Sequence, residues 1–486
     1  MVFQNNVLAG ASIVSDGLPD QYLINQSIRF NTSDNPFMGR TPSATGTEET
    51  WTWSFWIKRG KLGTLQILFQ IGSNKSNCDQ FYFNSDDELV YQHLDSGSNT
   101  DSIITKQLFR DTSAWYHIVL TADTTNAVES ERIRIYVNGV RVTDFDGTPN
   151  YPTQNTPTDV NTQVLHQIGA QLSATYYSFD GYMAEIVLLD GTATDCNSFA
   201  EFNSSGIWIP KDVSGLTFGT NGFHIDGRDA SGDPVKLGDD EAGSNNYTTS
   251  GLAAHDQVLD TPTNNFCVLT PLASLMNSGS TLSNGNLKIV LSGNDQFHSN
   301  FEISEKSYCE VRLDASSNYG GALGFGTFQG LDDDDNTIAF SMNYLSGRIN
   351  LGNGSSGGDV GGNVSVGDII MMALDPDTRK WWVGVNGTWR NSGDPAGGTG
   401  HVYQYATDYF DTSSSYSTTD GIGAIVWGGF KGSANGMTVT WNFGQEGTFG
   451  GQETAGGNAD GNGNGNFKYT VPSGFKALCS KSMGSE

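Results

Sequence analysis

Few residues in this sequence have the spacing that a catalytic site needs. Retaining glycoside hydrolysis uses two carboxyl groups about 5 Å apart, and one strand supplies both only if they share a face. No Glu-x-Asp-x-x-Glu motif of that kind occurs. Asp180 and Glu185, in the segment DGYMAE, lie five positions apart and are expected on opposite faces of an extended strand. We therefore expect no enzymatic activity, although the seven histidines leave a Ser/His/Asp triad open.

Two acidic segments resemble metal-binding loops without completing one. The run Asp332 to Asn336 lacks the glycine at position 6 and the distal glutamate of an EF-hand loop. Asn458, Asp460, Asn462 and Gly463 match positions 1, 3, 5 and 6 of such a loop, but its position 12 is a tyrosine. Because the bidentate ligand is missing, we interpret both as Gly/Asn-rich loop sequence and predict no metal ligands.

Aromatic residues beside acids are the best candidates for sugar recognition. Sugar-binding sites place aromatic rings against sugar faces and use Asn and Asp as hydrogen-bond partners. Tyr176 and Tyr177, just before Asp180, fit that description, and Trp389 is a second candidate. Trp382 and Trp389 are expected together on one outer strand face as a candidate contact patch. The alternative for each aromatic residue is burial in the protein's own structure, the common fate of large apolar rings.

Composition and charge narrow the protein's class. The formal net charge is −28, which argues against nucleic acid as a partner because such binding needs clustered Lys and Arg. The five cysteines are odd in number and have no metal-ligand spacing, so free, buried thiols and folding in a reducing cytoplasm are expected. From their composition, the first residues are not expected to act as a signal peptide, and no apolar run in the sequence is long enough to predict a membrane span. Release from the cell would then follow a non-secretory route such as lysis.

Two similar hairpins indicate how the chain folds. The segment RIRIYVNGVRVTDF alternates apolar and polar residues around Asn138-Gly139, which predicts a type I′ turn with Val137 opposite Val140. One face of this hairpin is expected on a core and the other in water. The segment KWWVGVNGTWR repeats the plan around Asn386-Gly387, with Gly384 opposite Trp389 and with Trp381 on the core face.

Short strands separated by turn residues continue along most of the sequence. This pattern predicts an all-β protein with two concanavalin-like antiparallel β-sandwich (jelly-roll) domains in tandem. A Pro/Thr/Asn-rich loop over 148–162 is long enough to hold a site. The expected organisation is an N-terminal anchoring arm over 1–20, a first sandwich over 21–205, a connector with short strands over 206–278 and a second sandwich over 279–486.

The order of these motifs resembles known families. SFWIKRG, WYHIVLTAD, RIRIYVNGVRV and FDGYMAEIVLLDGTA, in that order, resemble a laminin-G-like, concanavalin-type jelly roll. EISEKSYCEVRLDASSNYGGALGFG followed by VGDIIMMALDPDTRKWWVGVNGTW resembles a SPRY domain, whose fold is also concanavalin-like. The tandem, with its VLAGAS start and DTPTNNF junction, is similar to structural proteins of tailed marine phages.

The resemblance implies a non-enzymatic virion protein: a tail fibre, spike or capsid decoration. It implies attachment to other virion proteins through the N-terminal arm, homo-oligomers (trimers by family habit) and binding of bacterial surface glycans. Laminin-G-like domains often carry one calcium at the sandwich rim, which leaves calcium open as a cofactor. The alternatives are a secreted or surface carbohydrate-active enzyme or lectin, and an intracellular SPRY-type peptide-binding adaptor.

Overall fold

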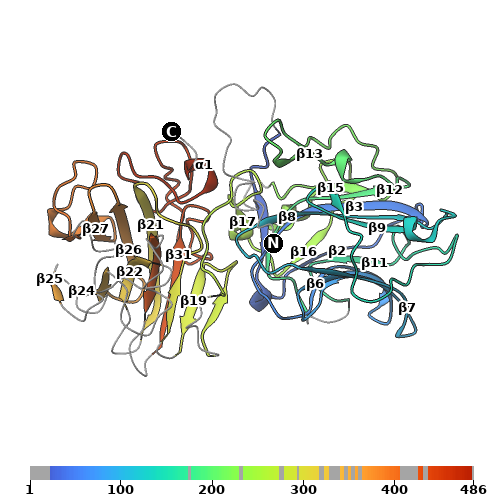
Figure 1. The fold of residues 1–486 in the computed structure, drawn as a ribbon, viewed down its shortest axis with the longest axis horizontal. Helices are drawn as coiled ribbons and strands as arrows, with labels where there is room; N and C mark the ends of the chain where they lie inside the picture. Colours follow the sequence, from blue (N-terminus) through green and yellow to red (C-terminus); the bar gives the residue numbers. More distant parts are fainter. Residues whose placement is uncertain are drawn as a thin grey trace. The chain divides into compact units, whose positions relative to one another are not determined.

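The computed structural model describes most of the chain. The described residues are 22–172, 177–228, 234–272, 279–292, 295–316, 322–327, 340–343, 348–351, 356–359, 364–405, 425–430 and 436–483. The predicted anchoring arm over 1–20, Tyr176 and the acidic run Asp332 to Asn336 lie outside these residues. The chain divides into two compact units, Met1–Asn265 and Phe266–Glu486, and both are built from antiparallel strands (Figure 1).

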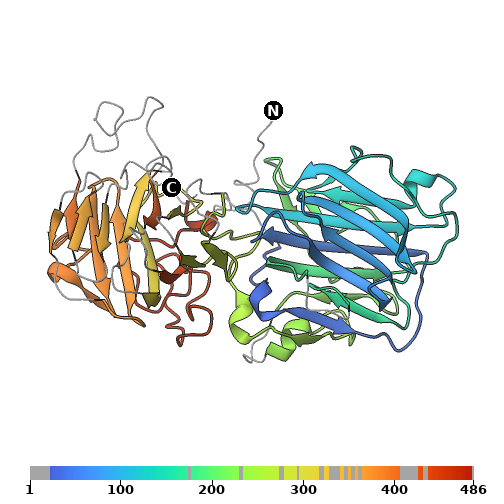
Figure 2. The same cartoon turned by 90° about the horizontal axis from the view of Figure 1, so that it is seen from below.

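Unit 1 contains two large sheets and a short strand pair. Sheet 1 has the order β10 (Val140–Arg141), β9 (Ile133–Val137), β8 (Trp115–Asp123), β3 (Thr50–Arg59), β12 (Gly181–Asp190), β1 (Ser27–Phe30) and β17 (Gln257–Val258), with β15 (Phe223–Ile225) also paired to β12. Sheet 2 has the order β16 (Thr248–Ser250), β2 (Phe37–Arg40), β11 (Leu165–Ile168), β4 (Gln66–Asn74), β5 (Asn77–Phe83), β6 (Glu88–Asp95) and β7 (Ser98–Leu108). The blue and teal strands of sheet 2 lie side by side in Figure 2. A separate pair joins β13 (Ala200–Phe202) to β14 (Trp208–Pro210).

Alternating apolar residues of the two sheets meet in the core of unit 1. Trp53 on β3 stacks on Phe69 on β4, with ring centroids 4.6 Å apart. Phe223 on β15 contacts the same Trp53 ring edge-on at 5.3 Å. Aromatic burial on this scale is a large part of what stabilises a sandwich.

The predicted connector over 206–278 is not a separate segment of the fold. Its strands β14 to β17 all belong to unit 1, where β15, β16 and β17 extend sheets 1 and 2. Phe223 and Ile225 enter the core, and Tyr247 packs edge-on against Phe223 at 4.8 Å. The chain therefore divides between Asn265 and Phe266, and the boundaries expected at 205 and 279 differ from that division because these short strands complete the first sandwich.

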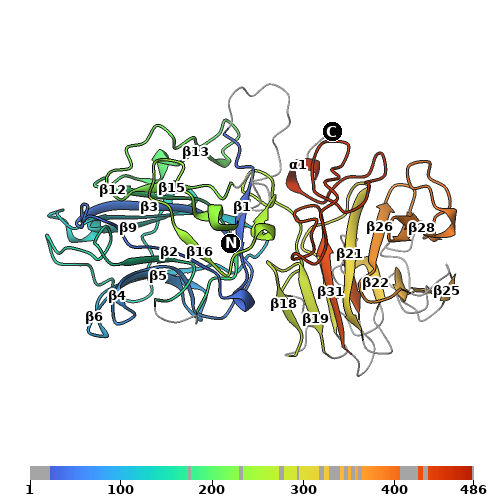
Figure 3. The ribbon, with the colours of Figure 1, turned by 180° about the vertical axis from the view of Figure 1, so that it is seen from behind.

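Unit 2 has two sheets of its own. Sheet 3 has the order β18 (Thr281–Ser283), β19 (Lys288–Leu291), β31 (Met437–Asn442), β21 (Ser307–Ser316), β26 (Ile369–Asp375), β27 (Lys380–Val385) and β28 (Thr388–Trp389), with β29 (Tyr403–Gln404) also paired to β27. Sheet 4 has the order β20 (Gln296–His298), β30 (Ile425–Phe430), β22 (Ala322–Thr327), β23 (Phe340–Asn343), β24 (Arg348–Leu351) and β25 (Ser356–Asp359). Figure 3 shows β19, β31, β21 and β26 adjacent in sheet 3. Phe325 on sheet 4 packs edge-on against Trp381 on sheet 3 at 5.4 Å.

Helical segments are short wherever the structure describes the chain. They are α1 (Ser480–Met483) and the 3₁₀ turns η1 (Thr32–Asp34), η2 (Glu129–Glu131), η3 (Cys196–Ser198), η4 (Pro234–Gly238), η5 (Ala254–Asp256) and η6 (Arg390–Ser392). Within those described segments, no helix is long and apolar enough to cross a membrane. All five cysteines are free and buried, as their number and spacing predicted.

Both predicted hairpin registers are confirmed. Val140 pairs with Val137 and Arg141 with Tyr136 in unit 1, and Thr388 pairs with Val385 and Trp389 with Gly384 in unit 2. The expectation that one face of the first hairpin meets water is confirmed only in part. On the outer face, Tyr136 is buried in a second apolar cluster with Phe199 and Trp208, because the chain after β12 returns across sheet 1. Arg134 and Arg141 on the same face are half-buried and Thr143 is exposed, while Val140, on the face expected against the core, is exposed.

Candidate functional site

A β-bulge in the middle of β12 places an acidic side chain outside the regular alternation. The register of β12 against β3 shifts between Ala184 and Val187, and Glu185 has a positive φ of 50°. Met183 and Ile186 both belong to the inner core, whereas Ala184 and Val187 belong to the outer cluster. Glu185 is thus the extra residue of the bulge, a conformation that costs energy and recurs beside functional sites.

Glu185 is held by two partners from distant parts of the chain. The Tyr22 hydroxyl donates to Oε1 at 3.1 Å and to Oε2 at 3.2 Å. The Nε2 of His224, on β15, lies 2.8 Å from Oε2 and is the donor because an ionised carboxylate only accepts. Both Glu185 and His224 are buried, so the three side chains form a fixed hydrogen-bonded group.

This group forms one wall of a cavity of about 520 Å³. Its rim carries the acids Asp212, Asp226 and Glu241 together with Arg228, and its apolar wall includes Leu216 and Phe218. The guanidinium of Arg228 pairs with Asp226 and lies 3.2 Å from Glu241. The cavity therefore combines hydrogen-bond acceptors, one exposed cation and an aromatic ring, a lining suited to a polar ligand with a hydroxyl-rich surface.

The electrostatics of the group favour a protonated histidine. Burial opposes protonation of His224, but the hydrogen bond and charge of Glu185, with the charges of Asp226 and Glu241, outweigh it and raise the pKa of His224. Burial, together with the negative charge of Glu185, raises the pKa of the Tyr22 hydroxyl. Tyr22 therefore stays a hydrogen-bond donor and His224 presents a positive charge to the carboxylate.

The sequence-predicted residues of the first unit lie apart from this cavity. Tyr177 is half exposed, with a positive φ of 62°, so its ring remains a candidate surface contact. Asp180 is buried and accepts a hydrogen bond from the Thr32 backbone N–H at 3.1 Å. Asp180 and Glu185 have separate partners. Their expected placement on opposite faces assumed regular alternation along the strand, and the bulge at Glu185 breaks that alternation.

The predicted tryptophan patch of unit 2 is not an open surface. Trp381 faces the core, as its register predicts. Trp382 lies on the outer face but is only 1% exposed, because its indole N–H donates to the Thr399 carbonyl at 2.7 Å and its ring packs on Phe475. Trp389 is half-buried and packs edge-on against Tyr308. Trp382 is therefore no contact residue, a correction caused by the chain after β28 folding back over it.

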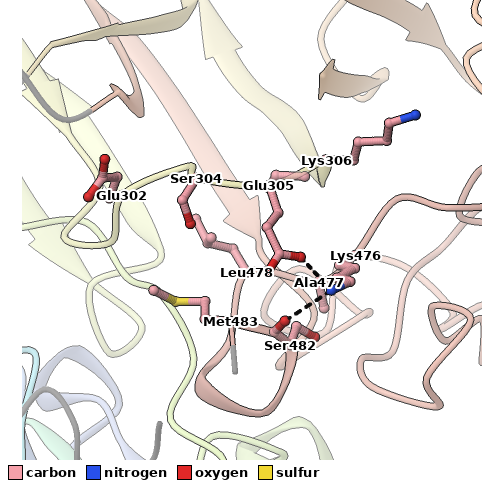
Figure 4. A pocket seen from close by; sticks show the side chains of 10 residues that line it. Glu302, Ser304, Glu305, Lys306, Lys476, Ala477, Leu478, Ser482 and Met483 are labelled. Carbon is pink, nitrogen blue, oxygen red and sulfur yellow. Dashed lines mark hydrogen bonds and ion pairs between the residues drawn. The ribbon is translucent and has the colours of Figure 1, made fainter. Parts of the chain in front are cut away.

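A small cleft in unit 2 is a weaker candidate (Figure 4). Its acids and lysines come from the segments 302–307 and 476–483. Lys476 pairs with Glu305 and also donates to the Ser482 carbonyl, as the dashed lines show. Because Lys476 and Glu305 pair with each other and Lys306 pairs with Asp375 outside the lining, most charged groups of the cleft already have partners within the protein and the cleft offers little to a ligand.

The glycine-rich loop that resembles an EF-hand is organised by its own hydrogen bonds. Asp460 is buried and accepts from the backbone N–H groups of Asn462, Asn464 and Ala477 at 2.9 Å each. A carboxylate used in this way caps the loop, which agrees with the absence of a distal ligand in the sequence.

One cluster among the described residues has the composition of a metal site. Asp79, His93 and Asp159 each offer one ligand atom, and these atoms lie within 4.8 Å of one another at the rim of unit 1. Asp159 comes from the loop over 148–162 that the sequence marks as long enough for a site. Calcium takes six to eight oxygen ligands, so a set of two carboxylates and an imidazole nitrogen does not fit the calcium that the laminin-G resemblance implies.

Sequence reasoning missed both groups for the same reason. Tyr22, Glu185 and His224 lie far apart in the sequence, and only the bulge and the strand pairing bring them together. A detectable signal existed for Asp79 and His93, because the strands DQFYF and ELVYQHL form a hairpin in which these two residues are direct partners.

Comparisons with known proteins agree with this architecture. Residues 38–196 match the model of the family Laminin_G_3, described as the concanavalin A-like lectin/glucanases superfamily. No curated protein matches the sequence. The family match includes Glu185 but neither Tyr22 nor His224.

Solved structures resemble the chain only distantly. A putative carbohydrate binding protein from Bacteroides ovatus is 17% identical, with 48% of this chain and 59% of that chain covered and a TM-score of 0.31. The SPRY domain of human HERC1 is 15% identical over 33% of this chain and 91% of its own, with a TM-score of 0.25. Mouse laminin alpha1 chain domains LG4-5 are 8% identical, with 85% of this chain and 91% of that chain covered and a TM-score of 0.28. The chain is an all-β protein of concanavalin-like β-sandwiches, and its first unit contains a laminin-G-like, concanavalin A-like jelly-roll domain that the family model matches over residues 38–196.

Proposed function

We propose that this chain is a non-enzymatic structural protein of a phage virion, a tail fibre, spike or capsid decoration, that binds host-surface glycans. The observation that carries the glycan part is the cavity beside Glu185, whose lining is polar, partly aromatic and open to solvent. Exposed carboxylates at Asp212 and Glu241 accept hydrogen bonds from sugar hydroxyls, and Arg228 donates them. The ring of Phe218 supplies an apolar surface for a sugar face.

A glycan array probed with the full chain tests this proposal. We expect binding to bacterial surface polysaccharides and a loss of about fivefold or more for Phe218→Ala, if stacking of a sugar face on the ring contributes as much as the roughly 1–3 kcal/mol of a stacked nucleobase. Phe202→Ala is the matched control, since Phe202 is an exposed aromatic residue that does not line the cavity. Equal loss in both variants, or no glycan bound at all, would contradict the proposal.

The virion part rests on the resemblance of the tandem to phage structural proteins and on the free, buried thiols. In this proposal the arm over 1–20 attaches the chain to other virion proteins, and the chain assembles as a trimer. Electron microscopy of particles labelled with an antibody to this chain is the direct test. Particles without label would end the virion assignment and leave the glycan proposal standing.

A carbohydrate-active enzyme is the second candidate, because a buried Glu–His pair held by a tyrosine is also an arrangement found in acid–base catalysis. An activity screen on algal and bacterial polysaccharides separates the two. Turnover that disappears in Glu185→Gln would establish the enzyme and overturn the non-enzymatic proposal. We expect no turnover in either form.

A further inference from the structure

The cluster at the rim of unit 1 is built around one fully buried carboxylate. Asp79 on β5 lies directly opposite His93 on β6, and its Oδ1 is 3.1 Å from the His93 Nδ1. The Tyr91 hydroxyl donates to the same Oδ1 at 2.8 Å. The backbone N–H of Asp159 donates to Oδ2 at 2.6 Å, so the loop is fixed against this carboxylate. The side chain of Asp79 is 0% exposed and cannot turn away to water.

Asp159 brings a second carboxylate to the same place. Its backbone is tied down on both sides, because its N–H binds Asp79 and its carbonyl accepts from the Thr162 hydroxyl. Its side chain is half-buried and accepts no hydrogen bond from the residues that the structure describes. Two carboxylates this close repel each other, and one histidine charge offsets only part of that repulsion.

The donor set selects a class of ion. Two carboxylate oxygens and one imidazole nitrogen suit zinc and similar divalent transition metals, while the nitrogen disfavours calcium and magnesium. Zinc bonds of about 2.0–2.1 Å at tetrahedral angles put neighbouring ligand atoms about 3.3 Å apart. The 3.1 Å between Asp79 Oδ1 and His93 Nδ1 is close to that separation.

We propose that Asp79, His93 and Asp159 bind one divalent transition-metal ion, with zinc as the preferred occupant, and that calcium does not compete for the site. The ion takes the place of the proton between His93 Nδ1 and Asp79 Oδ1, and that proton leaves to solvent. The Asp159 carboxylate, one oxygen of which lies within 4.8 Å of the other two ligand atoms, supplies the third ligand. Tyr91 keeps its hydrogen bond and orients Asp79, and the fourth tetrahedral position is left for water.

Metal analysis of the full chain tests this site. After dialysis against zinc chloride with calcium chloride in excess, we expect one zinc per chain and no calcium that displaces it. His93→Gln and Asp159→Asn each remove one ligand, and we expect each to weaken zinc binding by more than about tenfold. Asp144→Asn is the matched control, since Asp144 is an exposed acid of unit 1 outside the cluster. Glu185→Gln should also keep its zinc, which separates this site from the cavity.

Two results would overturn the proposal. Zinc binding that is unchanged in both ligand variants would mean an adventitious ion only, and calcium that displaces zinc would show that the ion class is wrong. X-ray absorption of the zinc-loaded wild-type chain does not depend on any variant folding. We expect nitrogen and oxygen neighbours with one imidazole, and sulfur neighbours would assign the metal to cysteine instead.

Discussion

The Asn138-Gly139 and Asn386-Gly387 hairpins are built alike up to their turns. Both asparagines and both glycines have positive φ, as a type I′ turn requires. Each asparagine side chain accepts the backbone N–H of a residue on the preceding strand, His117 in unit 1 and Ile369 in unit 2. The backbone N–H of each asparagine binds the carbonyl of that same residue. The two units therefore repeat one local design.

The hairpins differ in what covers their outer faces. In unit 1, Trp208 from β14 lies over His117 and donates its indole N–H to Nδ1 at 3.1 Å. In unit 2, the segment after β28 covers Trp382 through Thr399. The conformation of a turn depends on four neighbouring residues, whereas the segment that covers each outer face comes from a remote part of the sequence. Similar hairpins thus acquire different stabilities and different responses to pH.

The largest expected effect is at the covered tryptophan of unit 2. Trp382→Ala removes a fully buried ring, and we expect a loss of about 3–5 kcal/mol in the free energy of unfolding of that unit. Trp389→Ala should cost clearly less because Trp389 is only half-buried. Hydrogen exchange of β26 and β27 in graded denaturant measures both. Equal losses would show that the cover over Trp382 contributes little.

Acid should destabilise unit 1 through His117. The equivalent residue of unit 2 is Ile369, which does not titrate. Burial lowers the pKa of His117 to about 3, while the unfolded chain has the ordinary value near 6.5. Below pH 6.5 the unfolded state binds a proton that the folded state refuses, so the contribution to stability falls by about 1.4 kcal/mol per pH unit down to the folded pKa. Above pH 6.5 His117 adds no pH dependence.

The measurement compares denaturant midpoints of the wild type and His117→Gln between pH 7.5 and 5. We expect a flatter profile in the variant, with a remaining slope from His166, whose pKa burial lowers to about 4. Identical slopes would rule out His117 as a source of the acid response.

Substitution of the turn glycines should reveal a smaller difference in stability between the two hairpins. Gly139→Ala and Gly387→Ala both place a Cβ at a positive φ, which costs roughly 1–2 kcal/mol. A Cβ at 139 would lie 2.7 Å from the Trp208 ring, whereas one at 387 would lie 3.1 Å from the Tyr469 ring. Gly139→Ala should therefore cost more, as thermal unfolding of each variant would show. The reverse order would mean that Trp208 moves more easily than its packing implies.

The smallest effect should be shared equally. Asn138→Ala and Asn386→Ala each remove one side-chain acceptor for a backbone N–H, and each should cost about 1 kcal/mol. Asn386→Ala also removes a solvent-exposed hydrogen bond to Asp368, and this loss should add little. Chemical denaturation of the two variants measures the losses. A large difference between them would show that the two turns are not equivalent after all.

Local patterns in the sequence were enough for the local features of this protein. Alternating apolar residues and two Asn-Gly pairs predicted the all-β class, the register at Val137 and Val140, and the core position of Trp381. Cysteine number and spacing predicted free, buried thiols. These features depend on neighbours a few residues away, so the physical causes are visible in the printed sequence.

The tertiary structure decided what the sequence could not. The bulge that places Glu185 beside Tyr22 and His224 breaks the two-residue period on which strand predictions rest. The burial of Trp382 and the closeness of Asp79 to Asp159 depend on loops that return from far along the chain. Alternation predicts from which face of a sheet a side chain projects. Only the packed fold determines whether water, a second layer or another charged group lies against that face.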